Sequence, residues 1–314
     1  MRATPSLLIA LALLACEPEA APIERDSPPA QRPPPPLVEC AAGGPARAFE
    51  GVDPALAANA VVVHDAEGDA RLHRLDVPDD PLALPFRVLA VTRHGEGWLA
   101  ALPERFVELD VEGAIVWELA TDVEAVTAAL AVRADEAWLV LRDAEDEISA
   151  RRIDLRTREA DPPASVGRGR GRLLVAPGRA GWAGADGEVR VADGEVTLPG
   201  RPVAVVGEHV IWTAPDRTGL WIGDGVRATN PFATPEAALG ARVGERVVLA
   251  YRADSDLFVQ SVDPATGAVG IPALIAADAH PLDVAASGPR VWVAWARDDA
   301  TVEVRAAECS APQP

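Results

Sequence analysis

Short apolar runs alternate with polar residues along most of the chain, and this pattern predicts β-strands. Between about residues 43 and 309 the apolar runs are five to seven residues long and are bounded by Gly, Asp and Pro. We find no convincing long stretch in which apolar residues recur at the helical period of about 3.6 residues. This region is therefore expected to be all-β.

One signature recurs: an apolar run, a tight polar turn, and a second apolar run that often begins with tryptophan. The spacing between successive turns averages about 38 residues, with the turns at positions 59, 95, 135, 178, 207, 244 and 288. A period near 40, with several strands in each repeat, is typical of a β-propeller built from four-stranded blades. We predict a seven-bladed β-propeller over residues 38–310, with six or eight blades as open alternatives.

Tryptophans and aspartates support the repeat. Five of the eight tryptophans share one place in it and are expected to pack between blades, with a ligand platform as the alternative: Trp98, Trp138, Trp182, Trp212 and Trp292. An aspartate follows the third apolar run of six units, where its carboxylate can close a turn: Asp76, Asp110, Asp154, Asp193, Asp224 and Asp263.

Two of these turns suggest a family. The stretch 110–113 with Trp117 behind it, and the stretch 263–267, resemble the repeat of quinoprotein-like or WD40-like propellers. In that family a tryptophan docks each blade on the next. The other copies here lack it, so the chain resembles a degenerate member.

The last unit has no aspartate turn and no fourth strand of its own. Ring closure requires that strand, and the unassigned residues 38–50 are the obvious donor, antiparallel to residues 301–305. Cys40 and Cys309 would then lie side by side, and we predict a disulfide between them; two free thiols are the alternative. It would close some 269 residues and contribute about 4 to 5 kcal/mol in the chain-entropy model.

Residues 1–15 have the features of a secretion signal. Arg2 is followed by an apolar run that is too short to span a bilayer. Its end, Leu13-Leu14-Ala15-Cys16, resembles the lipobox of bacterial lipoproteins. The resemblance implies cleavage before Cys16 and a lipid on this cysteine, which would hold the protein at a membrane. An ordinary secretion signal with an incidental cysteine is the alternative.

Residues 16–37 are expected to form a lipidated, Pro-rich linker. Eight prolines fall in residues 17–37, which favours a stiff, partly polyproline tether without a core. Glu17 follows the cysteine, whereas an aspartate there resembles an inner-membrane retention signal. The sequence therefore favours export to the outer membrane. Residues 311–314 are expected to be a disordered tail.

Composition and charge exclude several functions. All 29 cationic residues are arginine, so mechanisms that need a lysine, such as a Schiff base or a P-loop, are excluded. The formal net charge of −19 argues against a nucleic-acid partner. No nucleophile elbow or local cysteine-nucleophile signature occurs. His64 and His73 flank one hairpin but are expected to be ordinary residues rather than metal ligands.

Acidic residues recur where the second and third strands of each unit would connect. These loops share one face in a propeller, and we expect the following residues to form an acidic rim there: Asp65, Asp69, Asp143, Asp146, Asp216, Asp254, Asp256, Asp298 and Asp299. Such a rim could bind a cationic partner or Ca²⁺. No loop has the spacing of a known calcium loop, so a solvated acidic face without metal or other cofactor is favoured.

These features favour a monomeric, lipid-anchored binding or scaffolding module for a protein or glycan partner in the cell envelope, without catalytic residues. The alternative is a carbohydrate-active enzyme that uses rim carboxylates. Asp216, followed by Trp221, resembles a degenerate Asp-box of sialidase-type propellers. That motif is structural in the family and implies the fold rather than the activity. Such an enzyme would need two carboxylates at a set separation, which the sequence does not identify.

Overall fold

The computed structural model describes residues 39–310 with short gaps, which are residues 78–80, 177–178, 185–187, 192–193, 198–200, 207–208, 214–219, 223–225 and 229–236. The described residues form 29 β-strands in seven sheets and contain no helix, which confirms the all-β expectation. In the part of the chain that is described, no helix could cross a membrane.

The first three blades follow one another along the chain. Blade 1 contains β2 (Val52–Ala57), β3 (Ala60–His64), β4 (Ala70–Arg74) and β5 (Leu82–Leu84). Blade 2 contains β6 (Ala90–His94), β7 (Gly97–Ala101), β8 (Arg105–Leu109) and β9 (Ile115–Ala120). Blade 3 contains β10 (Ala125–Arg133), β11 (Glu136–Asp143), β12 (Glu147–Asp154), β13 (Glu159–Ala160) and β14 (Ala164–Arg168), the last two both paired with β12.

The next three blades have four strands each. Blade 4 contains β15 (Gly171–Ala176), β16 (Arg179–Gly184), β17 (Glu188–Val191) and β18 (Gly194–Thr197). Blade 5 contains β19 (Arg201–Val206), β20 (His209–Thr213), β21 (Leu220–Ile222) and β22 (Val226–Ala228). Blade 6 contains β23 (Ala237–Val243), β24 (Arg246–Ala253), β25 (Asp256–Val262) and β26 (Ala273–Ala276).

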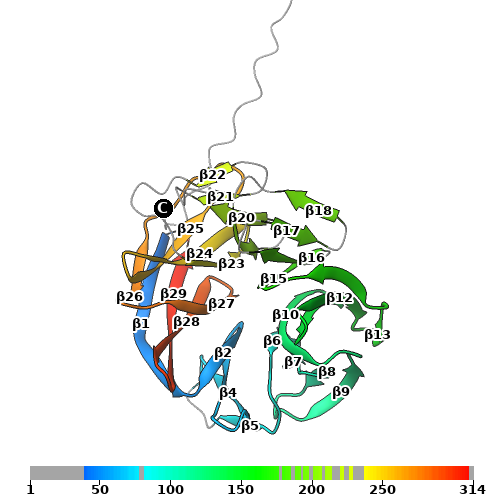
Figure 1. Cartoon of the computed structure of the whole chain (residues 1–314). Helices are drawn as coiled ribbons and strands as arrows, with labels where there is room; N and C mark the ends of the chain where they lie inside the picture. The colour runs from blue at the N-terminus through cyan, green and yellow to red at the C-terminus, as the bar shows by residue number, and fades with distance from the viewer. Residues whose placement is uncertain are drawn as a thin grey trace, which may run out of the picture. The chain divides into compact units, whose positions relative to one another are not determined.

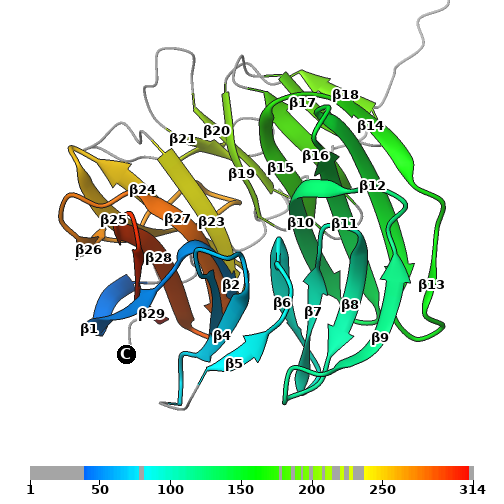
Figure 2. The same ribbon diagram turned by 60° about the horizontal axis from the view of Figure 1, so that its bottom comes forward.

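Blade 7 joins the two ends of the domain. Its own strands are β27 (Pro281–Ser287), β28 (Arg290–Asp298) and β29 (Thr301–Ser310), and its outer strand is β1 (Glu39–Glu50), antiparallel to β29. Cys40 is paired with Cys309 in the register and forms a disulfide with it. The predicted donor strand and the predicted covalent clasp are both confirmed. Figures 1 and 2 show β1 and β29 side by side.

The seven sheets close into a ring. Their first strands contact one another in the order β2, β6, β10, β15, β19, β23 and β27, and β27 contacts β2. Figure 1 labels six of these strands, all but β19, and shows them nearest the centre, with later strands of the blades farther out. The seven-bladed propeller is therefore the fold of the described chain.

The alternation of strand directions gives the ring two different faces. The connections between strands one and two, and between strands three and four, lie at one end; we call this the turn face. The connections between strands two and three, and between consecutive blades, lie at the other end, here called the loop face. β1 starts at Glu39 and β29 ends at Ser310, and both of these ends lie on the turn face.

The repeated aspartates close the turns of the turn face as predicted. The Asp110 carboxylate accepts the N–H groups of Glu112 and Ala114, both at 2.9 Å. Asp154 and Asp263 accept equivalent backbone bonds from residues two and three positions on. Asp76 accepts a hydrogen bond from the Asn59 side chain, and residues 78–80 of its turn lie outside the described residues. Asp193 and Asp224 lie outside the described residues.

Apolar side chains from facing sheets form the core, and tryptophans contribute to it. Trp98 is 1% exposed and packs with residues of blade 1, such as Val62 and Leu72. Trp292 packs with Val61 and Val63 across the junction of blades 7 and 1. Burial of large apolar side chains between sheets stabilises the ring by about 2 to 3 kcal/mol for each side chain. The expected role of these two tryptophans between blades is confirmed.

Candidate functional site

The structure places the predicted rim residues in the connections of the loop face. Asp65 and Asp69 lie between β3 and β4, and Asp143 and Asp146 at the connection of β11 to β12. The equivalent connections of blades 6 and 7 hold the rest of the described rim, Asp254, Asp256, Asp298 and Asp299. Asp216 lies outside the described residues. The rim is thus spread over blades 1, 3, 6 and 7.

Some rim carboxylates are occupied in holding their own loops. The Asp65 carboxylate accepts the N–H groups of Glu67 and Asp69, at 3.1 and 3.0 Å. Asp143 accepts two equivalent bonds in blade 3. Asp298 accepts the Ala300 N–H at 3.0 Å. This bond, with further hydrogen bonds from Thr301, lowers the pKa of Asp298 below the ordinary aspartate value.

Two further rim aspartates bind neighbouring segments. The Asp146 carboxylate forms an ion pair with Arg170 at 2.7 Å. Asp256 accepts the N–H of Asp278 at 3.3 Å, and this bond links the loop of blade 6 to the connection that leads into blade 7. These contacts give the side chains structural roles in the loop face.

A third group of acidic side chains has carboxylates without a partner in the described chain, and we call these the uncommitted carboxylates. Among the described residues, the carboxylates of Asp69, Asp254 and Asp299 have no hydrogen bond or ion pair, and neither has that of Asp278. These carboxylates lie on blades 6, 7 and 1, which are consecutive in the ring; on blade 3 and the connection leading into it, the carboxylates of Glu145 and Glu124 likewise have no hydrogen bond or ion pair in the described chain. They are therefore available to a cationic group from outside the chain.

A shared metal site is not formed where the chain is described. No group of three or more His, Cys, Asp or Glu side chains there could hold one ion, so the rim aspartates do not converge on a calcium site. His64 and His73 do not face each other, because His64 pairs with Ala70 and His73 with Val61. His64 is buried instead and accepts the Val88 N–H at 3.1 Å, which ties blade 1 to the next connection.

The backbone conformation of the loop face favours aspartate. Five aspartates there have a positive φ between 47° and 64°: Asp53, Asp122, Asp146, Asp254 and Asp278. Gly51, Gly68 and Ser255 also have a positive φ on the loop face, whereas on the turn face the described residues with positive φ are glycines apart from Ala134 and Arg158. Glycine and, less readily, aspartate tolerate this conformation. Glycine could adopt the same backbone conformation at these positions. The aspartates therefore add negative charge to the loop face that the backbone conformation does not require.

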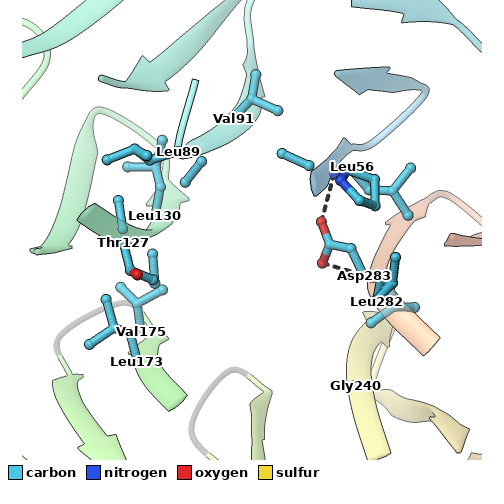
Figure 3. Close-up of a pocket in the computed structure, with 16 residues that line it drawn as sticks. Leu56, Leu89, Val91, Thr127, Leu130, Leu173, Val175, Gly240, Leu282 and Asp283 are labelled. Atoms are coloured by element: carbon cyan, nitrogen blue, oxygen red, sulfur yellow. Dashed lines mark hydrogen bonds between the residues drawn. The ribbon is translucent and has the colours of Figure 1, made fainter. Parts of the chain in front are cut away.

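A cavity of about 430 Å³ lies in the centre of the ring, enclosed by the first strands of six blades. Most side chains that line it are apolar, and Figure 3 shows Leu89, Leu130 and Leu173 across from Leu56 and Leu282. The lining residues come from different heights along their strands: Ala90 and Val91 from the start of β6, Leu282 and Asp283 from the start of β27, but Ala55 and Leu56 from the second half of β2. The cavity therefore occupies the middle of the ring and reaches toward the loop face at β6 and β27.

Exposed apolar side chains lie at the loop-face ends of three innermost strands. Val52, Val126 and Leu282 are 38%, 46% and 43% exposed. Each lies at the start of β2, β10 or β27, where the pairing register with the next strand shifts. A bulge of this kind redirects side chains away from the regular pattern of the sheet. We call these three residues the apolar mouth.

Among the described residues that line the cavity, Asp283 is the only charged one. Its two oxygens accept the N–H groups of Leu56 at 2.6 Å and Val284 at 2.8 Å, and Figure 3 shows both bonds. The bond to Leu56 joins the last blade to the first on the inner side of the ring. Asp283 is therefore a structural link across the ring closure.

Sequence reasoning identified the acidic loops and missed the apolar mouth. Val126 and Leu282 look like ordinary members of the apolar runs that form strands, and bulges have no clear signature in a single sequence. The one available signal was Asp283, a lone charge inside an apolar run. The predicted lipidation site Cys16 and the segments 1–15, 16–37 and 311–314 lie outside the described residues.

Comparisons with known proteins identify the fold. No protein-family model and no curated protein sequence matches the chain. A chain of the mitotic checkpoint complex has a TM-score of 0.57 at 14% identity, and the match covers 95% of this chain and 98% of that one. The BBS1N chain from a complex with ARL6DN has 0.55 at 9% identity, covering 88% and 98%. The Pan2 WD40 domain of Neurospora crassa has 0.54 at 11% identity, covering 88% and 95%. These likenesses concern the fold alone.

Proposed function

We propose that the protein is a non-catalytic binding module of the cell envelope, anchored by a lipid on Cys16, whose loop face engages a protein partner. The observation that carries the proposal is the different use of the two faces. Both ends of the ring lie on the turn face. Exposed apolar residues and carboxylates without a partner in the described chain occur on both faces, but the exposed apolar residues of the turn face, such as Val77 and Ile271, lie in connections between outer strands, whereas the apolar mouth lies at the ends of the innermost strands. Exposed apolar groups rimmed by polar ones are typical of protein-binding surfaces.

The anchor and the binding face suit each other in this proposal. Residues 17–38 separate the expected lipid from β1, and an extended polyproline-like segment of this length reaches about 70 Å. Because β1 begins on the turn face, the linker joins the ring at the end opposite the apolar mouth. The loop face would thus remain accessible while the lipid holds the protein at the membrane.

Site-specific photo-crosslinking on intact cells tests this proposal. A crosslinking amino acid at Val126 reports contacts of the loop face, and one at Glu96 is the matched control on the turn face. We expect a defined protein adduct from position 126 and none from position 96. Adducts of equal yield from both positions, or none from the first, would contradict a loop-face partner.

Two further measurements test the remaining parts of the proposal. Incorporation of labelled palmitate should occur in the natural protein and disappear in Cys16→Ala; equal labelling of both would exclude this anchor. Reporter glycosides should not be hydrolysed. Hydrolysis that is lost when one rim aspartate is changed would instead support the carbohydrate-active alternative.

A further inference from the structure

We propose that the loop face binds a cationic peptide segment whose central apolar side chain enters the mouth of the cavity, next to blades 6, 7 and 1. This inference rests on the proposed function and specifies the chemistry of its partner. Three observations carry it: the apolar entrance, the location of the uncommitted charges, and the pairing of the nearby arginines.

The apolar entrance provides the central contact. Leu282 lines the cavity and is 43% exposed, and Val52 starts the neighbouring innermost strand. The cavity volume of about 430 Å³ falls within the usual range of ligand pockets. An apolar side chain that enters it would shield Leu282 from water, and such central apolar contacts dominate the affinity of many interfaces.

The uncommitted carboxylates lie in loop-face connections of the blades that hold Leu282 and Val52, and of the neighbouring blade 6. Asp254 and Asp278 precede Leu282 along the ring, and the segments that hold them are joined by backbone hydrogen bonds. Asp299 lies next to Ala300, whose carbonyl accepts the N–H of Gly51 at 2.8 Å, one residue before Val52. Asp69 continues the row on blade 1. An apolar centre between carboxylates fits a segment with cations on both sides of an apolar residue.

The cationic side chains of these blades do not neutralise this row. Arg71 faces Asp65 at 3.8 Å and Arg297 faces Glu303 at 3.4 Å. Arg252 is also engaged within the chain. The free charges at the entrance are therefore negative, and complementary charge would favour both the encounter and the orientation of a basic segment.

Selection from a random library of displayed nonapeptides tests the inference on the full-length lipidated protein in nanodiscs. We expect enriched peptides with arginine or lysine on both sides of an apolar residue. The affinity of the enriched peptides, measured by fluorescence anisotropy, should fall about tenfold when NaCl is raised from about 50 to about 300 mM.

Two sets of variants separate the apolar contribution from the charged one. Leu282→Ser with Val52→Ser, and Asp254→Asn with Asp299→Asn, should each weaken the peptides about tenfold. The matched controls are exposed residues outside the loop face: Val77→Ser with Val116→Ser, and Glu96→Gln with Asp135→Asn. The controls should leave the affinity unchanged, and circular dichroism should confirm that every variant is folded.

Several results would overturn the inference: no enrichment, enrichment of peptides without cations, or affinities that the two loop-face sets leave unchanged. The proposed function is tested independently by the crosslink at Val126. A protein adduct there, combined with a failed peptide selection, would leave the binding module in place and reject only the cationic partner. If neither the protein adduct nor the enrichment of cationic peptides is observed, both proposals are rejected.

Discussion

Positive φ values are met mainly by glycine on the turn face, whereas on the loop face five aspartates adopt them beside Gly51, Gly68 and Ser255. Gly95 and Gly244 have φ values of 57° and 60° in turns of the turn face. On the loop face, Asp254 and Asp278 both have a φ of 49°. An L-residue pays a steric cost in this region, and aspartate tolerates it better than most. The backbone therefore does not require the charge that aspartate brings.

Several turn-face residues stabilise the fold, whereas the loop-face aspartates give that surface negative charge. The turn face contains the disulfide and a buried ion pair between Arg246 and Asp263, which are 2.7 Å apart with side chains 9% exposed. The loop face contains carboxylates without partners in the described chain, such as Asp254 and Asp278. We expect turn-face changes to affect stability and loop-face changes to affect binding.

The largest effect is expected from opening the covalent clasp. Cys40→Ser with Cys309→Ser frees a loop of 269 residues in the unfolded chain, and the free energy of unfolding should fall by about 5 kcal/mol in the chain-entropy model. Denaturant titration measures this change. Reduction of the natural protein should give a similar loss; a variant as stable as the oxidised natural protein would show that strand pairing alone closes the ring.

The next effect concerns the buried ion pair. Arg246→Met leaves the Asp263 carboxylate without its cation in a site where it is 6% exposed. The free energy of unfolding should decrease by about 3 kcal/mol. Arg152→Met is the matched control, because Arg152 pairs with Glu136 and Asp161 at the surface and should contribute little. Equal losses from both variants would contradict the importance of burial.

Acid should weaken the same turn. Burial alone would raise the pKa of Asp263, but the Ala265 N–H, the Thr266 hydroxyl and the Arg246 guanidinium together hold this pKa below its ordinary value. A lowered pKa in the folded state stabilises the protein at neutral pH, and this contribution is lost as pH falls through the folded-state value. Asp263→Asn should therefore destabilise at neutral pH, and its difference from the natural protein should shrink in acid. A pH-independent difference in denaturant midpoints would contradict this.

The smallest effect on stability is expected on the loop face. Asp254→Gly with Asp278→Gly keeps a residue suited to positive φ and removes two charges. The free energy of unfolding should change by less than about 1 kcal/mol, while binding of the selected cationic peptides should weaken.

The matched control is Gly95→Asp with Gly244→Asp, which adds two charges to the turn face, where an added Cβ has no atom within 4 Å. This control variant should not alter peptide binding. A collapse in stability of the loop-face variant would show that Asp254 and Asp278 are structural.

The ring and its closure could be predicted because both follow from the spacing of turns and apolar runs along the chain. Turn positions such as 95 and 244 lie between paired strands as expected, and Cys40 lies opposite Cys309 because an antiparallel donor strand begins beside the end of the strand with which it pairs. The acidic rim was partly predictable. Its loops were placed correctly, but no sequence pattern distinguished Asp143, which closes its own turn, from Asp254, whose carboxylate stays free.

By itself the sequence determined the strand content, the repeat, the disulfide and the excess of acid on one set of loops, because each of these depends on residue type and spacing. Only the tertiary structure decided which carboxylates remain free and that Leu282 opens onto the central cavity beside them. Hydrogen bonds within a loop depend on its exact backbone path, and the cavity is enclosed by strands from six blades that are far apart in the chain. Both properties arise only when the ring has closed.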